Sequence, residues 1–491
     1  MLFNSIDFAI FLLNSIDFAI FLPIVFLVYW FLVNKSLKLQ NLFILAASYV
    51  FYGWWDWRFL FLILISTLQD YWVALAMGNT EEEKKRRILL WVSMITNLGF
   101  LGFFKYYNFF VDQFVDLFTF FGYSFHPKAL RIVLPVGISF YTFQTMSYTI
   151  DVYKRKVKPA KDLIAFGAYV AFFPLLVAGP IERATHLLPQ FFKKRTFEYP
   201  YAVDGLRQML WGFFKKMAIA DNCAICVDHI FDNYTTLPAS TLLLGAFFFS
   251  VQIYCDFSGY SDIAIGCSRL FGFNAMRNFA YPYFSRDIAE FWRRWHISLT
   301  TWFRDYVYIP LGGSRVSKAK VIRNTFIVYL VSGFWHGANW TFIVWGLINA
   351  IYFLPLLLGG KNRKYLDVVA HDRAFPNLKE LWQMGSTFAL AMFAWIFFRA
   401  ESVTQAVAYI KGLFSKSIFS FPMEGFHCGS FILVLVPLMF VMEWIGRRDQ
   451  YAIQTIGLGW NKHIRYIFYC MIIILSLWFV EEKQQFIYFQ F

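Results

Sequence analysis

The sequence is dominated by long apolar runs that carry almost no charged side chains. Such runs occupy residues 41–55, 59–77, 88–104, 130–150, 163–181, 241–255, 325–358, 382–398, 430–445 and 464–480. A helix needs ~20 mostly apolar residues to cross a bilayer, and in hydrocarbon its backbone groups must be satisfied within the segment. The runs therefore predict an all-α, polytopic integral membrane protein. With residues 6–32 included, we expect about eleven transmembrane helices.

The charge pattern agrees with this class. Only 15% of the 491 residues are charged, and 59% are hydrophobic, whereas soluble proteins have roughly 25% charged residues. The formal net charge of +14 would suggest nucleic acid in a soluble protein. Here the basic residues gather in short loops at 84–87, 154–156, 193–195 and 447–448. Such loops are typical of the cytoplasmic side of a membrane protein, so we expect lipid around the chain and no nucleic acid.

No polar stretch is long enough for a soluble domain, so we expect one membrane domain over residues 1–491. The nine residues NSIDFAIFL occur at 4–12 and again at 14–22. A period of ten turns a helix by roughly 280°, so the copies share no face and indicate a local duplication. The start has no charged region before its apolar residues, which predicts a retained first span.

One segment, residues 285–304, mixes polar and apolar residues in a helical pattern. If it is one helix, an arc of roughly 120° gathers its polar residues. These are Glu290, Arg293, His296, Thr300 and Arg304. Glu290 and Arg294 also stand four residues apart in the order that favours an ion pair. The segment is either part of a site, as a re-entrant helix, or an interfacial helix whose charges face water.

A second segment, residues 324–339, places a histidine inside an apolar span. One stripe of this helix contains Thr325, Tyr329, Ser332, His336 and Asn339. A histidine there is costly unless it faces a cavity or a partner. Gly333 and Gly337 flank it and allow another backbone or a substrate to approach closely. The alternative is a buried structural histidine that forms hydrogen bonds between helices.

Burial disfavours the charged form of imidazole, so we expect His336 to rest neutral. A neutral imidazole can act as a general base on a hydroxyl that attacks an acyl carbonyl. A dry site also protects an activated thioester from hydrolysis. The sequence contains none of the motifs G-x-S-x-G, H-x-x-x-x-D, H-E-x-x-H, Walker A or G-x-G-x-x-G, and no metal-ligand pattern.

Two long motifs connect these segments to a known family. Residues 291–315 (FWRRWHISLTTWFRDYVYIPLGGSR) and 332–346 (SGFWHGANWTFIVWG) resemble the signature of the membrane-bound O-acyltransferase family. Further pieces match at 178–190, 255–266 and 278–285. The resemblance covers much of residues 134–350. It is to the bacterial branch that acts on alginate, peptidoglycan and teichoic acid.

The resemblance implies a helical bundle with re-entrant or interfacial helices around a central funnel, in the bacterial inner membrane. His336 matches the catalytic histidine of the family. His296 matches a second signature position, a histidine in this branch and often asparagine elsewhere, which orients the substrate or stabilises charge. An acyl donor, acetyl-CoA or an acylated carrier protein, would enter from the cytoplasm, with no bound cofactor. The acceptor would be a polysaccharide on the opposite side.

The last six residues, 486–491, read FIYFQF and match F-x-Y-x-x-F. By the resemblance, Tyr488 would carry the acyl group and pass it to an extracytoplasmic SGNH-type acyltransferase. A phenol suits this role because its ester has a better leaving group than a sugar ester. The alternative is an aromatic tail anchored at the membrane interface.

Several other polar residues are candidates for holding the donor or the substrate. They are Arg293, Arg304, Asp305, Thr300, Ser332, Asn339 and Tyr329. Guanidinium groups pair well with phosphate. Equally, the arginines of this region can form ion pairs with Asp287, Glu290 and Asp305.

The favoured function is O-acyl transfer, with acetyl as the expected group. A transporter of an envelope precursor is the alternative, in which buried polar residues line a pathway. Transporters are often built from internal repeats, and the two halves of this sequence show no such similarity. A scaffold for a soluble enzyme is less favoured, because it needs no base inside the membrane.

Overall fold

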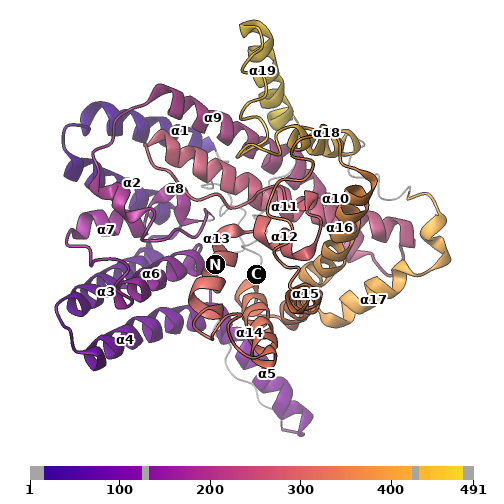
Figure 1. Ribbon diagram of the computed structural model, residues 1–491, viewed down its shortest axis with the longest axis horizontal. Helices are drawn as coiled ribbons and strands as arrows, with labels where there is room; N and C mark the ends of the chain where they lie inside the picture. The colour runs from indigo at the N-terminus through magenta and orange to yellow at the C-terminus, as the bar shows by residue number, and fades with distance from the viewer. Residues whose placement is uncertain (1–15, 124–131, 178, 423–430, 479–491) are drawn as a thin grey trace. The chain divides into compact units, whose positions relative to one another are not determined.

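The computed structural model describes residues 16–123, 132–177, 179–422 and 431–478 (Figure 1). Every regular element in these ranges is an α-, π- or 3₁₀-helix, which confirms the all-α prediction for them. Contacts group the chain into two compact units. The first comprises Met1–Ala202 and Cys267–Met276, and the second comprises Val203–Gly266 and Arg277–Phe491.

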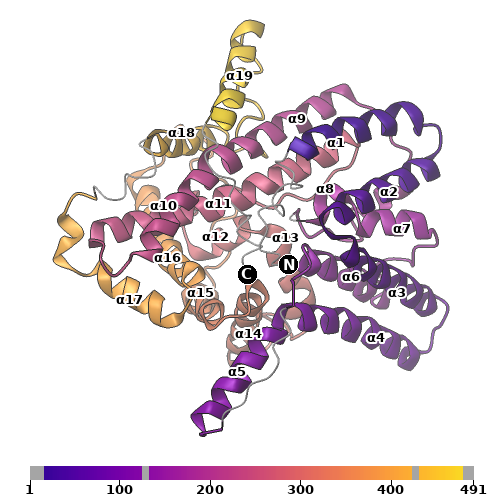
Figure 2. The same ribbon diagram turned by 180° about the vertical axis from the view of Figure 1, so that it is seen from behind.

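The helices of the first unit come from the first half of the chain and are coloured indigo to magenta in Figure 2. They are α1 (Ile16–Leu27), α2 (Leu37–Asp56), α3 (Leu60–Gly78), α4 (Glu83–Leu101), α5 (Tyr107–Phe120), α6 (Ile138–Tyr153), α7 (Leu163–Val170) and α8 (Phe173–Leu176). Asp70 of α3 accepts hydrogen bonds from Ser93 Oγ at 2.7 Å and Asn97 Nδ2 at 2.9 Å, both on α4. Ser93 Oγ also lies 3.0 Å from Thr149 Oγ1 of α6. These side chains form hydrogen bonds with one another, and the bonds offset the free-energy cost of burying polar groups between the three helices.

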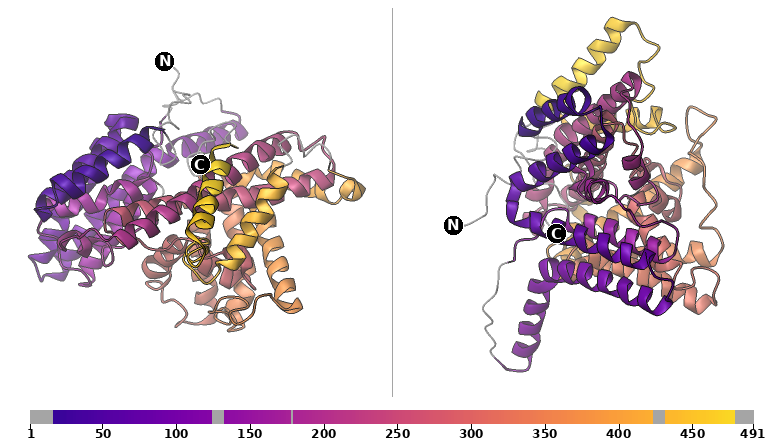
Figure 3. Two further views of the ribbon diagram at one scale, coloured as in Figure 1. Left: turned by 90° about the horizontal axis from the view of Figure 1, so that it is seen from above. Right: turned by 90° about the vertical axis from the view of Figure 1, so that its left-hand side faces the viewer.

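The second unit contains both segments that carry the candidate histidines. Its helices are most of α9 (Tyr199–Phe213), α10 (Asp221–Asp232), most of α11 (Ala239–Leu270), α12 (Ile288–Arg294), α13 (Ile297–Phe303), α14 (Lys318–His336), α15 (Trp340–Leu358), α16 (Leu378–Arg399), α17 (Val403–Leu413), α18 (Ile432–Ile445) and α19 (Lys462–Trp478). In both views of Figure 3, α19 is the yellow helix.

Local sequence explains where several of these helices begin. At α16, the Asn377 side chain accepts from the backbone N–H of Glu380, whose carboxylate accepts from the backbone N–H of Asn377. This reciprocal capping box satisfies two N–H groups that the helix itself leaves open. At α15, the Asn339 side chain accepts from the backbone N–H of Thr341 at 3.0 Å. Asn339 is therefore a helix cap that follows His336 by three residues.

Within the described residues, five helical segments are long and apolar enough to cross a membrane. They are Leu37–Gly78, Glu83–Phe120, Ala239–Leu270, Trp340–Leu358 and Leu378–Arg399. Three shorter apolar helices are Asp17–Leu32, Leu163–Leu176 and Ile432–Ile445. Large side chains such as Trp72 and Trp91 are exposed on the first unit, at 60% and 57%. A bilayer covers surfaces of this kind, so the chain is a multi-pass membrane protein.

Candidate active site

The predicted base, His336, is the last residue of α14, where the chain turns back into α15. The two helices meet closely because glycines replace side chains at the contact. A Cβ at Gly333 would overlap the Phe342 carbonyl, and one at Gly346 would overlap the Tyr329 carbonyl. At Gly337 it would overlap the Phe342 ring. Gly333 and Gly337 thus admit α15 itself close to His336, as expected of glycines in a membrane helix pair.

Aromatic rings enclose His336, which is only 4% exposed. Its ring centroid lies 5.1 Å from that of Trp345 and 5.4 Å from that of Phe398. The preceding residue, Trp335, contributes a third ring at 5.0 Å. The imidazole is therefore surrounded by aromatic rings and largely shielded from solvent, the environment expected for a reaction with an activated acyl donor.

The second candidate, His296, lies at a break in the helix rather than within one. The prediction of a single helix over 285–304 is wrong, because α12 ends at Arg294 and α13 begins at Ile297. His296 has φ 42° and ψ 56°, in the left-handed region. A non-glycine residue there costs of order 1–3 kcal/mol and needs support from its surroundings. The polar arc inferred for a continuous helix does not exist in this form.

A buried asparagine supplies that support. The backbone carbonyl of Asn278 accepts the N–H of Ile297 at 2.9 Å. Its side-chain Oδ1 lies 3.1 Å from His296 Nδ1 and accepts from Ser298 Oγ at 2.9 Å. His296 itself is 1% exposed. Burial lowers the pKa of its imidazole to about 3, so the ring is neutral at physiological pH.

One tryptophan contacts both histidines. The Trp335 ring centroid lies 6.2 Å from that of His296 and 5.0 Å from that of His336. A second path of rings runs from Trp345 beside His336 to Trp395 at 5.6 Å, and from Trp395 to Trp295 at 4.9 Å. The structure thus brings the two candidate histidines into one aromatic cluster of the second unit.

The arginines of α12 are engaged by protein groups. Arg294 forms an ion pair with Glu290 at 2.8 Å, which confirms the predicted pairing four residues apart. Glu290 also accepts from Arg286 at 3.0 Å. Arg293 donates to the backbone carbonyls of Asn362 and Tyr365, at 2.5 and 2.7 Å. Arg294 is therefore ion-paired, as the alternative interpretation expects, whereas Arg293 is bound by main-chain oxygens.

The same arginines hold the loop between α15 and α16, residues 359–377. Arg447 extends this pattern, since it donates to the carbonyls of Val369, Ala370 and Arg373 at 3.2, 2.9 and 2.6 Å. Backbone carbonyls along the loop are thus held by guanidinium groups from α12 and from Arg447, which follows the end of α18. Charge-assisted hydrogen bonds of this kind stabilise an irregular segment whose backbone carbonyls have no partners within a helix.

The other candidate residues are placed as follows. Tyr329 lies on α14, with its ring 5.9 Å from Trp292, and Ser332 is half-buried one turn before His336. Thr300 Oγ1 donates to the Trp295 carbonyl at 3.2 Å, and Asn339 Nδ2 donates to that of Glu401 at 2.8 Å. Arg304, with 58% of its side chain exposed, pairs with Asp305 at 2.7 Å.

The tail candidate Tyr488 lies outside the described residues. The structure also adds site residues that the sequence reasoning missed, chiefly Asn278, Trp335 and Trp345. The one available signal was the matching motif piece that begins at Asn278, and no spacing rule relates this residue to His296. Trp335 and Trp345 were hidden among the many aromatic residues of a membrane protein.

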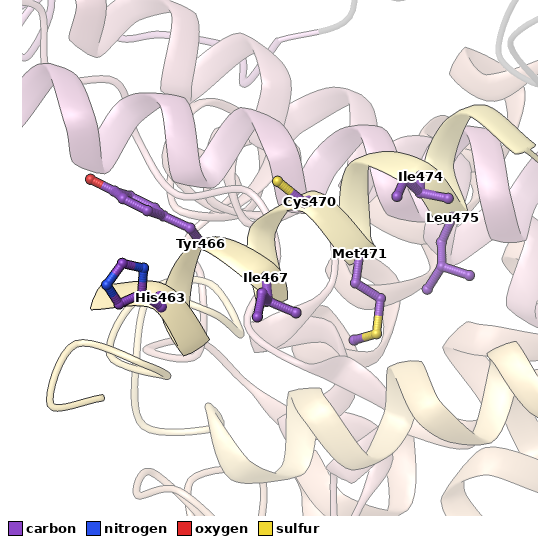
Figure 4. A pocket seen from close by; sticks show the side chains of 7 residues that line it. All are labelled: His463, Tyr466, Ile467, Cys470, Met471, Ile474 and Leu475. Atoms are coloured by element: carbon purple, nitrogen blue, oxygen red, sulfur yellow. The ribbon is translucent and has the colours of Figure 1, made fainter. Parts of the chain in front are cut away.

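A separate groove of about 530 Å³ runs along α19 (Figure 4). Its lining residues are His463, Tyr466, Ile467, Cys470, Met471, Ile474 and Leu475. All of them belong to one helix and most are apolar, which is the composition of a lipid-facing surface. Neither candidate histidine lines this groove.

Comparison with known proteins identifies the class. A profile of the MBOAT, membrane-bound O-acyltransferase family matches residues 157–361, which include both histidines. The chain is 41% identical over 414 residues to "Probable alginate O-acetylase AlgI" of Pseudomonas aeruginosa, covering 82% of this chain and 76% of that protein. It therefore belongs to the membrane-bound O-acyltransferase family, and it is a multi-pass membrane enzyme that transfers acyl groups from a donor to an acceptor.

Two further relatives show the breadth of the family. The peptidoglycan O-acetyltransferase of Helicobacter pylori is 32% identical over 518 residues, covering 96% of this chain and 95% of that protein. The teichoic acid D-alanyltransferase of Bacillus subtilis is 31% identical over 260 residues, covering 49% and 63%. The similarity thus extends along nearly the whole chain for an acetyl-transferring relative.

Proposed function

We propose that this enzyme O-acetylates an exported or cell-envelope polysaccharide from the bacterial inner membrane. The names of the relatives support this substrate class, since alginate and peptidoglycan are both polysaccharides outside the cytoplasm. The donor is a cytoplasmic thioester, acetyl-CoA or an acylated carrier protein, and no bound cofactor takes part. About eleven spans and a central funnel complete the proposed architecture.

His336 acts as the general base in this proposal. Its neutral imidazole takes the proton of the attacking hydroxyl while that oxygen forms a bond to the acyl carbon. The bond from acyl carbon to sulfur then breaks, and the leaving thiolate takes the proton from the imidazolium. The observation that carries the assignment is the burial of His336 in the aromatic cluster that it shares with His296. General base catalysis of this kind contributes typically 10²–10⁴-fold.

In the same proposal, the attacking hydroxyl belongs either to the polysaccharide or to Tyr488. An acyl-Tyr488 would deliver the group to an extracytoplasmic SGNH-type partner, which moves it to the polymer. The support is the F-x-Y-x-x-F motif and the family resemblance. Tyr488→Phe keeps the ring but removes the hydroxyl, so polymer acetylation should stop while acetyl-donor binding persists.

The central test is His336→Ala in cells, with mass spectrometry of their polysaccharides. We expect acetylation of the polymer to disappear while the protein accumulates in the membrane at its usual level. His463→Ala is the matched control, because this histidine lies on the α19 groove and should leave acetylation unchanged. Full polymer acetylation by His336→Ala would contradict the proposal.

A further inference from the structure

Asn278 is an asparagine with no exposed surface that joins three parts of the second unit. Its backbone carbonyl holds the first residue of α13, Ile297, and its Oδ1 lies 3.1 Å from His296 Nδ1. Its Nδ2 donates to Ser261 Oγ on α11 at 3.1 Å. One side chain therefore fixes the position of the helix break and one nitrogen of the histidine that lies at the break.

The orientation of the Asn278 amide follows from its neighbours. Its Oδ1 lies 3.4 Å from the backbone nitrogen of Ser298, a group that can only donate. If the amide were turned the other way, its NH2 group would face the backbone N–H of Ser298, and two donors would point at each other. The oxygen must therefore face Ser298 and His296. Because this oxygen can only accept, His296 Nδ1 must carry the proton. In a neutral imidazole the other nitrogen, Nε2, then holds the lone pair.

The charged groups on the packed elements face other partners. On α11, Asp256 and Asp262 pair with Lys216 and Lys215, each at 2.7 Å. On α12, Glu290 pairs with the arginines described above. On α14, His336 is the titratable group that shares the Trp335 ring with His296.

Neutral groups lie against the His296 ring: Asn278, Ser298, Phe257 with a ring-centroid distance of 4.6 Å, Phe279 and Trp335. Burial accounts for the low pKa of this ring given above.

We propose that Asn278 is a positioning residue that makes His296 a hydrogen-bond acceptor in acyl transfer. This rests on the proposed function. With Nδ1–H committed to Asn278, Nε2 receives a hydrogen bond from a donor group of the substrate, such as a hydroxyl beside the one that reacts. A stabiliser of the oxyanion would need N–H at Nε2. His296 therefore orients the substrate, and the alternative role of stabilising developing charge is excluded.

The first test replaces the amide by a carboxylate of the same shape, Asn278→Asp. A carboxylate beside Nδ1 favours the imidazolium and raises the pKa of His296, by roughly 1–3 units for a close pair. The protonated ring cannot accept at Nε2. The acid limb of the pH–activity profile should thus move to higher pH, and activity should recover as the pH rises. Asn278→Ala should instead lose about tenfold in activity, the value of one hydrogen bond, without this shift.

Two controls show whether the shift passes through His296. Asn324 is also an asparagine with no exposed surface, and it donates to the Leu311 carbonyl at 3.0 Å. Asn324→Asp should keep the wild-type midpoint. Asn278→Asp combined with His296→Gln should lose the shift. A wild-type pH profile for Asn278→Asp would overturn the proposal.

A spectroscopic test is independent of activity and of the Asn278 variants. Imidazole ¹⁵N chemical shifts of the labelled protein in lipid, assigned by the signals lost in His296→Gln, report which ring nitrogen is protonated. We expect Nδ1–H, and an Nε2–H ring would overturn the inference. Activity in His336→Ala would instead contradict the proposed function and leave this result standing.

Discussion

The two histidines of the site are held in place by different means. Packing fixes His336: helix α14 ends there, α15 lies against Gly333, and rings of Trp345 and Phe398 enclose the imidazole. Hydrogen bonds fix His296, which occupies a left-handed turn and faces Asn278. Packing thus determines the position of His336, the proposed base. In the proposal above, a polar partner determines which nitrogen of the second ring is protonated.

The largest expected difference between them is kinetic. His336→Gln removes the proposed base and should lower kcat by roughly 10²–10⁴-fold. In the role proposed above, His296→Leu removes an acceptor that binds substrate in both ground and transition states, so KM should rise about tenfold with kcat nearly unchanged. Steady-state kinetics of the purified enzyme with a soluble acceptor separates the two. Equal losses of kcat in both variants would show that the histidines act as one unit.

A second comparison tests the role of packing around His336. Gly333→Ala places a methyl group against the Phe342 carbonyl, which should force α14 away from α15 at a cost of ~1–3 kcal/mol. Both the melting temperature in detergent and the activity should fall. Gly385→Ala is the matched helical control, because the space around that glycine on α16 is open. Unchanged melting and activity in Gly333→Ala would contradict a packing role for this contact.

The smallest expected effect concerns acid stability. Burial lowers the pKa of His296 from 6.5 to about 3, so between these values the unfolded chain binds a proton that the folded chain does not. This contribution to stability is present above pH 6.5 and is lost as the pH falls towards 3. His296→Asn removes the titration, and asparagine tolerates the left-handed conformation. Its melting temperature should therefore drop less than that of the wild type between pH 7 and pH 5.

An equal drop in His296→Asn and wild type would show that other groups account for the acid sensitivity. His296→Ala is the useful companion variant, because alanine also lacks the titration but is strained at a positive φ. It should melt at a lower temperature than His296→Asn at either pH.

The sequence predicted the all-α membrane class, because long apolar runs are local signals. Family motifs singled out His296 and His336, and the structure places both beside the Trp335 ring. The sequence also predicted the Glu290–Arg294 pair, which depends only on helical spacing. It failed at the break between α12 and α13, since the stretch around His296 contains neither glycine nor proline. The break depends on Asn278, eighteen residues away, and helical periodicity cannot register such a non-local contact.

The attachment of the 359–377 loop has a consequence for how this enzyme can diverge. Arg293 and Arg447 donate hydrogen bonds to main-chain oxygens, which every amino acid supplies. These bonds therefore depend little on which side chains the loop residues carry. Exposed positions such as Lys361, Arg363 and Lys364 can therefore be substituted during evolution while the hydrogen bonds that hold the loop are kept. In an alignment of related sequences, residues of this loop should vary, whereas the positions of Arg293 and Arg447 should remain arginine.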